Sequence, residues 1–531
     1  LIPNRSGFII TFTIEEGKRY RFSKIDVKAS FRDLSIKELK SLIKIQKDDW
    51  YSVKQIDKTV SNLTDFVGTL GYAFVDIRPK IIPDYKNQLI NLTFEINKGP
   101  RVFVERIEII GNIRTVDSVI RREIPIAEGD AFNVSKIRYS KQKIFDLGFF
   151  ETVNIKHTVG SSPDKVLIKV KISEKSTGQL SFGIGASSEG PMGDISIRER
   201  NFLGKGQDVF LSTKLGSQTN QLDFSFTEPY FLDRKISTGI DIFRTSRDLQ
   251  STSSFERESF GGKLRIGYEL SEKIRQRLQY GVSAEKVTNV DSSASLAVKE
   301  QEGSSFKSEF SQSLFYDTRD SRINPTKGFY TNYSVDLAGL GGSVKYLRNK
   351  LKAIQYFTFT DDLIGRLSGN LGYIFGLDDK IRIIDRFFLG GRNLRGFESH
   401  GVGPRDTATS DAIGGNLILT VKSELKFPLG FPKELGVMGR LFSDVGSLSE
   451  SDSESGTVSD EFSPRASIGF GLTWKTALGP LSMDFSQAVI KEKFDNDHNS
   501  WLKFSLANIS TNFNPLSLSF VNFIVSKSIC F

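Results

Sequence analysis

The chain has 531 residues, of which 38% are hydrophobic and 11% aromatic, and its formal net charge is +9. This aromatic content argues against disorder, no stretch approaches the roughly 18 unbroken apolar residues of a membrane-spanning helix, and one Cys excludes a disulfide scaffold. The charge lies in residues 1–177, with 31 Lys and Arg against 22 Asp and Glu, whereas the remaining 354 residues hold 41 of each. We interpret this basic excess as a solvated face, or as a surface that attracts anionic lipid headgroups or acidic partners.

The first third of the chain repeats one pattern. Runs that alternate apolar and polar residues, as half-buried strands do, recur at 11–17, 93–99 and 168–174. Between them lie pairs of amphipathic helical stretches, at 35–45 and 53–70 and again at 115–123 and 134–147. The second stretch of each pair ends at Gly71 or Gly148, a typical helix cap. Each unit is therefore predicted to run strand–helix–helix–strand–strand.

This order, with a period of about 80 residues, resembles the POTRA domain. On this resemblance, residues 1–17 are the last strand of a truncated POTRA domain, and residues 18–100 and 101–176 are two complete ones. The chain begins at Leu1 without an initiator Met, so we expect a fragment or a processed chain, and the repeat favours a fragment. Such repeats act as spacers, or their strand edges pair with an extended client, and the sequence leaves both open.

From Gly178 onward, helical spacing gives way to about sixteen alternating runs of about ten residues. In one of them Leu222, Phe224 and Phe226 share one face, with Asp223 and Ser225 on the other. A membrane strand needs roughly 9–11 residues with one apolar and one polar face. We therefore predict a 16-stranded antiparallel transmembrane β-barrel over residues 177–513, with an atypical tail over 514–531. A soluble sandwich or propeller is the alternative.

Two segments interrupt the alternation. Residues 316–329 carry charged residues followed by Pro325 and Gly328, which indicates a strand end and a tight turn. Residues 385–405, between the eleventh and twelfth runs, form a long Gly-rich stretch that contains Leu394, Arg395, Gly396 and Phe397.

The tetrapeptide 394–397, at this loop, resembles the signature of the BamA family of outer-membrane assembly factors, part of a superfamily of POTRA-plus-barrel insertases and translocases. The resemblance covers essentially the whole chain. It implies that the loop folds into the barrel, where Glu424 on the twelfth run and Asp444 on the thirteenth hold Arg395. A buried arginine needs such partners. The alternative is a salt bridge of structural value only. The resemblance also suggests that residues 316–329 form a structural turn on the periplasmic side.

The resemblance implies an insertase that folds β-barrel proteins into the bacterial outer membrane, with its POTRA domains in the periplasm. Unfolded barrel proteins, accessory lipoproteins and the lipid bilayer are the implied partners. Clients would pass a lateral seam between the first and last strands, and Phe182, Gly183 and Gly185 lie on the first. The last strand begins at 501–506, but the chain continues, so either 516–524 replaces it or a tail follows.

No catalytic motif is visible, so no enzyme is expected. With three widely separated His residues, we expect no metal and no cofactor, and we expect no nucleic-acid partner. A polypeptide translocator or secretion pore of the same superfamily is the main alternative function. A passive porin or receptor barrel is a third, although such a barrel would not need POTRA repeats.

Overall fold

The computed structural model divides into two compact units, Leu1–Ser176 and Thr177–Phe531. It describes residues 19–29, 35–69, 75–97, 102–187, 190–322, 324–360, 362–378, 380–432, 435–452, 458–476, 479–493 and 503–505. The predicted strand over 1–17 and the tail over 514–531 therefore lie outside the described residues. Within these ranges, no helix is long and apolar enough to cross a membrane.

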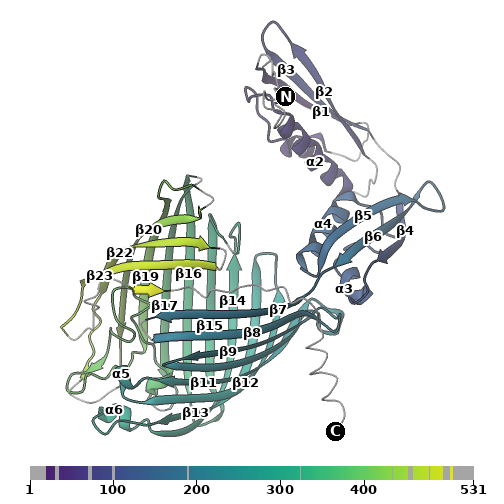
Figure 1. Ribbon diagram of the computed structural model, residues 1–531. Helices are drawn as coiled ribbons and strands as arrows, with labels where there is room; N and C mark the ends of the chain where they lie inside the picture. The colour runs from purple at the N-terminus through teal and green to yellow at the C-terminus, as the bar shows by residue number, and fades with distance from the viewer. Residues whose placement is uncertain are drawn as a thin grey trace, which may run out of the picture. The chain divides into compact units, whose positions relative to one another are not determined.

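The first unit contains two copies of one small α+β fold (Figure 1). The first copy runs β1 (Arg21–Ala29), α1 (Ile36–Ser41), α2 (Val53–Thr69), β2 (Asp76–Asp84) and β3 (Leu89–Asn97). The second runs β4 (Phe103–Ile110), α3 (Asp117–Arg121), α4 (Val134–Asp146), β5 (Phe150–Val159) and β6 (Lys165–Glu174). In each copy the last strand lies in the middle of the sheet, parallel to the first strand and antiparallel to the other. The predicted strand–helix–helix–strand–strand order is confirmed.

Each copy has its own hydrophobic core between helices and sheet. The second helix of each pair matches its prediction, and Gly148 has the left-handed φ of +75° expected of a cap, while Gly71 lies outside the described residues. The first helices are shorter than predicted. Helix α1 ends at Ser41, and Ile45 enters the core from a non-helical segment. In the second copy α3 spans Asp117–Arg121 and is two residues shorter at each end than the predicted stretch.

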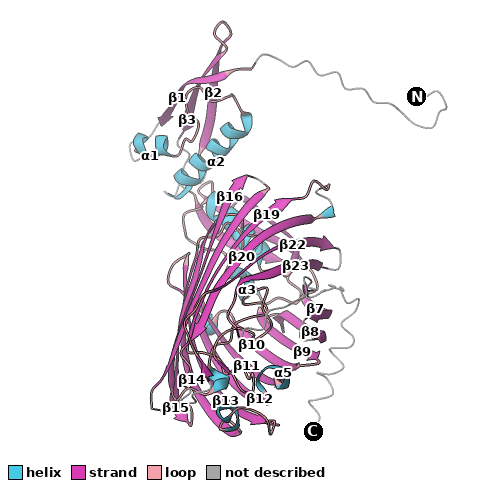
Figure 2. Cartoon of the chain, turned by 90° about the vertical axis from the view of Figure 1, so that its left-hand side faces the viewer, coloured by secondary structure: helices cyan, strands magenta, loops and turns pink. Residues whose placement is uncertain are grey.

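The second unit is one antiparallel sheet whose described strands follow one another in sequence order. Figure 2 shows that this sheet is strongly curved. The strands of this sheet that the structure describes are β7 (Gly178–Ser187), β8 (Gly190–Phe202), β9 (Gln207–Gly216), β10 (Thr219–Glu228), β11 (Ile236–Asp248), β12 (Glu256–Glu269), β13 (Ile274–Thr288), β14 (Gly303–Asp317), β15 (Gly328–Gly342), β16 (Tyr346–Thr360), β17 (Leu363–Gly376), β19 (Leu417–Pro428), β20 (Val437–Ser449), β22 (Arg465–Thr476), β23 (Gly479–Ile490) and β24 (Lys503–Ser505). Only three residues of β24 are described, and among the described residues no pairing joins β24 to β7.

The two faces of the sheet differ in chemistry. On one face apolar side chains such as Leu222, Ile240 and Ile242 are exposed to solvent. The alternate residues carry polar groups that pair across strands, as Asp241 does with Arg265 at 2.6 Å. The polar face lines a cavity and receives a long loop, so it is the concave one.

Several strands are longer than the runs of about ten residues that the sequence suggested. Strands β12–β17 have 14 or 15 residues. Their ends carry polar residues on both faces, as at Glu285 and Lys286 in β13. The alternation of apolar and polar residues therefore ends a few residues before the strand ends. Two connections between strands contain single helical turns, α5 (Gln250–Ser253) and α6 (Leu296–Lys299).

Candidate functional site

The candidate site is the 40-residue loop that connects β17 to β19, residues 377–416. It contains a 3-10 turn, η2 (Ile383–Asp385), and a two-residue strand, β18 (Arg405–Asp406), which pairs with β21 (Val458–Ser459). Apolar loop side chains, Leu394 and Phe397 among them, are fully buried in one cluster with Leu448 of β20. The loop is therefore packed against the sheet.

Two glycines allow the loop to take this path. Gly390 and Gly396 have φ of +126° and +89°, which side-chain-bearing residues rarely adopt. A Cβ on Gly396 would lie 2.9 Å from the Cβ of Ser467 on β22 and 3.2 Å from the backbone nitrogen of Ala488 on β23. The glycine of the tetrapeptide thus lets the tip of the loop touch two strands directly.

Arg395 is held by both carboxylates that the resemblance implied. Its Nη2 lies 2.6 Å from Asp444 Oδ1, its Nε donates to Asp444 Oδ2 at 2.8 Å, and its Nη1 lies 3.3 Å from Glu424 Oε2. The ring of Phe442 packs against the guanidinium group, and its centroid lies 3.5 Å from Arg395 Cζ. Asp444 is fully buried, so this charge-assisted pair lies away from solvent.

Sequence reasoning missed two members of this cluster, Arg440 and Asp484. Arg440 Nη2 lies 2.8 Å from Asp484 Oδ1, and Asp484 Oδ2 lies 3.9 Å from Arg395 Nη1. Both residues are opposite Gly471 in neighbouring strand pairs. A Cβ on Gly471 would meet the Asp484 carboxylate at 2.2 Å, so this glycine leaves the space that the ion pair crosses. We call Arg395, Arg440, Glu424, Asp444 and Asp484 the tip clamp.

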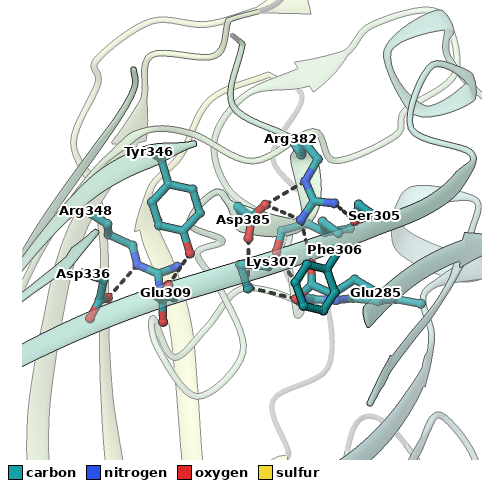
Figure 3. A network of polar contacts seen from close by, with 12 residues as sticks. Glu285, Ser305, Phe306, Lys307, Glu309, Asp336, Tyr346, Arg348, Arg382 and Asp385 are labelled. Atoms are coloured by element: carbon teal, nitrogen blue, oxygen red, sulfur yellow. Dashed lines mark hydrogen bonds and ion pairs between the residues drawn. The ribbon is translucent and has the colours of Figure 1, made fainter. Parts of the chain in front are cut away.

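A second ionic cluster holds the start of the loop (Figure 3). Arg382 Nη2 lies 2.6 Å from Glu285 on β13 and 2.7 Å from Asp385. Lys307 on β14 bridges the same two carboxylates at 2.8 and 3.2 Å, and Arg257 on β12 pairs with Glu285 at 3.0 Å. The side chains of Glu285 and Asp385 are only 2% and 1% exposed. We call these five residues the root clamp.

The root clamp was also missed, because Arg382 and Glu285 are far apart in sequence and only the packing of the loop against the sheet brings them together. The two clamps attach the loop to different parts of the sheet, the root to β12–β14 and the tip to β19, β20 and β23.

A residue of the acidic segment 449–461, Asp452, also contacts the long loop. Asp452 accepts hydrogen bonds from the backbone of Ile381 at 2.8 Å and from Asn416 Nδ2 at 2.9 Å. Its carboxylate therefore fastens both ends of the long loop.

The three residues of the predicted seam lie on β7, the terminal strand of the sheet. Phe182, Gly183 and Gly185 are opposite Ile195, Asp194 and Met192 of β8. A Cβ on Gly183 would collide with the Asp194 carboxylate at 2.1 Å. Among the described residues, the other edge of β7 has no paired strand.

The predicted turn at 316–329 connects β14 to β15. Asp317 pairs with Arg319 at 2.8 Å, and Asp320 accepts hydrogen bonds from the hydroxyl and backbone of Thr326 at 2.6 and 2.9 Å. Strand alternation places this turn at the same edge of the sheet as the start of β7.

Two POTRA-type folds followed by a curved antiparallel sheet with a pinned inward loop define the class of POTRA-plus-barrel proteins. Residues 201–509 match the Omp85 superfamily domain, and residues 20–99 and 102–175 match the POTRA family, described as a surface antigen variable number repeat. The chain belongs to the Omp85 superfamily.

The chain is similar to proteins named outer membrane protein assembly factor BamA. It is 30% identical to that of Neorickettsia risticii over 93% of this chain and 66% of the relative, and 26% identical to that of Neisseria meningitidis over 92% and 66%. The chain thus spans about two thirds of the length of these relatives. Its fold is similar to the crystal structure of BamA from Haemophilus ducreyi lacking POTRA domains 1–3, with a TM-score of 0.73, 23% identity and coverage of 93% and 100%. Its fold is also similar to that of CdiB from Escherichia coli, with a TM-score of 0.57 and 14% identity, over 96% and 94% of the two chains.

Proposed function

We propose that this protein is an outer-membrane insertase, which folds β-barrel proteins and inserts them into the bacterial outer membrane. The observation that carries the proposal is the loop tetrapeptide 394–397 pinned through Arg395 to Asp444, in a chain with POTRA domains. The relatives named as assembly factors support the same function. The POTRA domains then lie in the periplasm and the sheet in the membrane.

In the membrane the sheet closes as a 16-stranded barrel between β7 and β24. Backbone groups left unpaired in lipid are costly, which favours closure. The seam between these two strands is the weak point of the barrel. Gly183 and Gly185 on β7 support this role, because glycine weakens strand pairing and packing.

The clients are unfolded outer-membrane β-barrel proteins, which the POTRA domains receive and the seam templates. Accessory lipoproteins and the bilayer complete the assembly. The work is mechanical rather than catalytic, since opening the seam is tolerable only while a client strand satisfies the exposed backbone groups. While the seam opens, the pinned loop ties β19, β20 and β23, which lie on the β24 side of the seam, to β12–β14 in the middle of the sheet.

Liposomes that contain the full chain and an unfolded barrel client test this function. Client folding is followed by protease protection, with Arg395→Ala beside the unmodified protein. We expect the unmodified protein to accelerate folding and Arg395→Ala to lose most of that acceleration. Arg234→Ala, on an exposed turn, is the matched control and should keep it. Conductance through the reconstituted protein without client folding would instead favour a translocator or a porin.

A further inference from the structure

A large cavity lies on the concave face of the sheet, next to Arg395. Its volume is about 1340 Å³, and its walls come from strands β12–β17, β19, β20 and β23 and from the long loop. The walls carry ten Lys and Arg residues but only four Asp and Glu. Residues 178–531 as a whole hold equal numbers of basic and acidic residues, so the positive charge is concentrated in this cavity.

The four acidic residues of the cavity already have basic partners. Asp336 and Glu309 pair with Arg348 at 2.9 and 3.1 Å. Glu424 and Asp484 belong to the tip clamp, where two arginines share them. These carboxylates are therefore not available to neutralise the remaining cations.

Five basic residues of the wall have no such partner. Within the part of the chain that the structure describes, no carboxylate oxygen lies within ion-pair distance, 4.0 Å, of the side chains of Lys263, Arg277, Lys352, Arg366 and Arg392. Arg366 shows the shortage of carboxylate partners most clearly. It is opposite Glu424 in the strand register, but Glu424 contacts Arg395 and Arg440, and the buried Nε of Arg366 has no hydrogen-bond partner.

Neutral hydrogen-bond donors surround these cations. Lys352 is opposite Asn332 on β15 and Asn370 on β17, and both amides line the cavity with several serine hydroxyls. Unpaired charges between low-dielectric walls create a potential of several kT, which concentrates ions of opposite sign. Arginine and lysine together with amide and hydroxyl donors suit oxyanions, and guanidinium groups bind phosphate in a bidentate manner.

We propose that this cavity is a binding site for a soluble oxyanion of the phosphate class that carries two or more negative charges. Arg366 is a main ligand, and Lys352, Arg277 and Arg392 supply the surrounding positive charge. Arg392 belongs to the loop and Arg366 to β17, so a bound anion also ties the loop to the sheet. The site goes beyond insertion, since binding requires no client.

Lysine footprinting of the full chain in detergent micelles tests the proposal, with sodium pyrophosphate as the probe and sodium chloride at matched ionic strength as reference. Acetylation of Lys352 and of Lys205, on an exposed turn outside the cavity, is followed by mass spectrometry. We expect pyrophosphate to slow acetylation of Lys352 at least fivefold, with saturation, and to leave Lys205 unchanged. Equal rates at Lys352 in both salts overturn the proposal.

Thermal unfolding supplies a second measurement. Multivalent anions also stabilise proteins by exclusion from the surface, but that effect does not saturate and is common to all variants. We expect Tm to rise with pyrophosphate concentration and then to level off. The pyrophosphate concentration at half of this rise should be at least tenfold higher in Arg366→Gln and unchanged in Lys205→Gln. A midpoint equal in all three proteins contradicts the site. If Arg366→Gln does not fold, the footprint of the unmodified protein still decides.

The source of the phosphate group is tested by the same footprint with a short-chain phosphatidate in place of pyrophosphate. Protection by pyrophosphate without protection by phosphatidate supports a soluble ligand. Protection by the phosphatidate alone contradicts the soluble ligand proposed here and shows that a lipid headgroup occupies the cavity.

Discussion

Arg395 and Asp444 form a two-pronged contact across 49 residues of sequence, with Nη2–Oδ1 and Nε–Oδ2 distances of 2.6 and 2.8 Å. The backbone nitrogen of Arg395 also donates to Asp444 Oδ2 at 3.2 Å. One buried carboxylate therefore orients both the side chain and the backbone at the tip of the loop. A lysine could not reproduce this geometry, since it lacks the planar fork.

Neutralising Asp444 should free the loop tip. In Asp444→Asn the side chain keeps its shape, but only Glu424, at 3.3 Å, and the more distant Asp484 remain as charged partners of Arg395. Breaking a buried pair costs about 3–5 kcal/mol, so we expect a clear drop in Tm. The exposed pair between Asp378 and Lys345 offers the control, because Asp378→Asn should cost less than about 1 kcal/mol. Equal effects of the two substitutions would contradict the tip clamp.

Removing the charge of Glu285 should loosen the root of the loop. Glu285→Gln leaves three cations, Lys307, Arg257 and Arg382, with Asp385 as their remaining carboxylate. We expect faster trypsin cleavage at Arg392 and Arg395 in the folded protein and a lower Tm.

The half-exposed pair of Arg198 and Asp208 is the control for the root clamp. Asp208→Asn should leave the trypsin cleavage rate of the loop unchanged. Cleavage that is as slow in Glu285→Gln as in the unmodified protein would mean that the root clamp does not hold the loop.

A methyl group at Gly471 should break the contact between Arg440 and Asp484. The added Cβ of Gly471→Ala would lie 2.2 Å from Asp484 Oδ1 and 3.2 Å from Arg440 Nη2. Such overpacking costs about 1–3 kcal/mol. At Gly267, also within a strand, a Cβ has no neighbour closer than 3.8 Å. Denaturant unfolding of Gly471→Ala and Gly267→Ala compares the two, and a larger loss at Gly267 would refute this account.

The second POTRA domain should lose stability in acid through Glu174. Burial raises the pKa of Glu174, but hydrogen bonds from Thr115 and Arg114 outweigh it and lower the pKa below its ordinary value. The carboxylate therefore stabilises the fold above the unfolded-state pKa of about 4.3, and this contribution is lost as pH falls through the lower folded-state pKa.

Glu174→Gln tests this pH dependence. We expect the variant to unfold at a lower temperature than the unmodified protein at pH 7 and at the same temperature once pH is below the folded-state pKa. A difference in Tm that stays constant with pH would show that the carboxylate charge is not the cause.

The sequence predicted those parts of the structure that depend on local pattern. Alternation at residues such as Leu222 and Phe224 revealed the sheet, and helical spacing with Gly148 revealed the second POTRA domain. The pairing of Arg395 with Glu424 and Asp444 came from the family resemblance, and the structure brings these three residues together.

What the sequence could not predict depends on strand register. Arg440 reaches Asp484 only because Gly471 lies between them in the sheet, and Arg382 meets Glu285 across 97 residues of sequence. Arg440 and Asp484 lie at inward-facing polar positions that the alternation marks, but many such positions exist and pattern alone does not pair them. Arg382 lies in the loop, and Glu285 lies at a strand end where the alternation is lost. The ends of α1 and of the long strands were missed because core packing and polar termini, rather than periodicity, set them.

The most direct test of the central claim is a double-mutant cycle on client folding in liposomes, with Arg395→Ala, Asp444→Ala and the double variant. If the pinned loop drives insertion through this pair, each single variant should slow client folding at least tenfold, about 1.4 kcal/mol, and the double variant should be no slower than either. Single variants that insert clients at the unmodified rate, or effects that add fully in the double variant, would contradict the account.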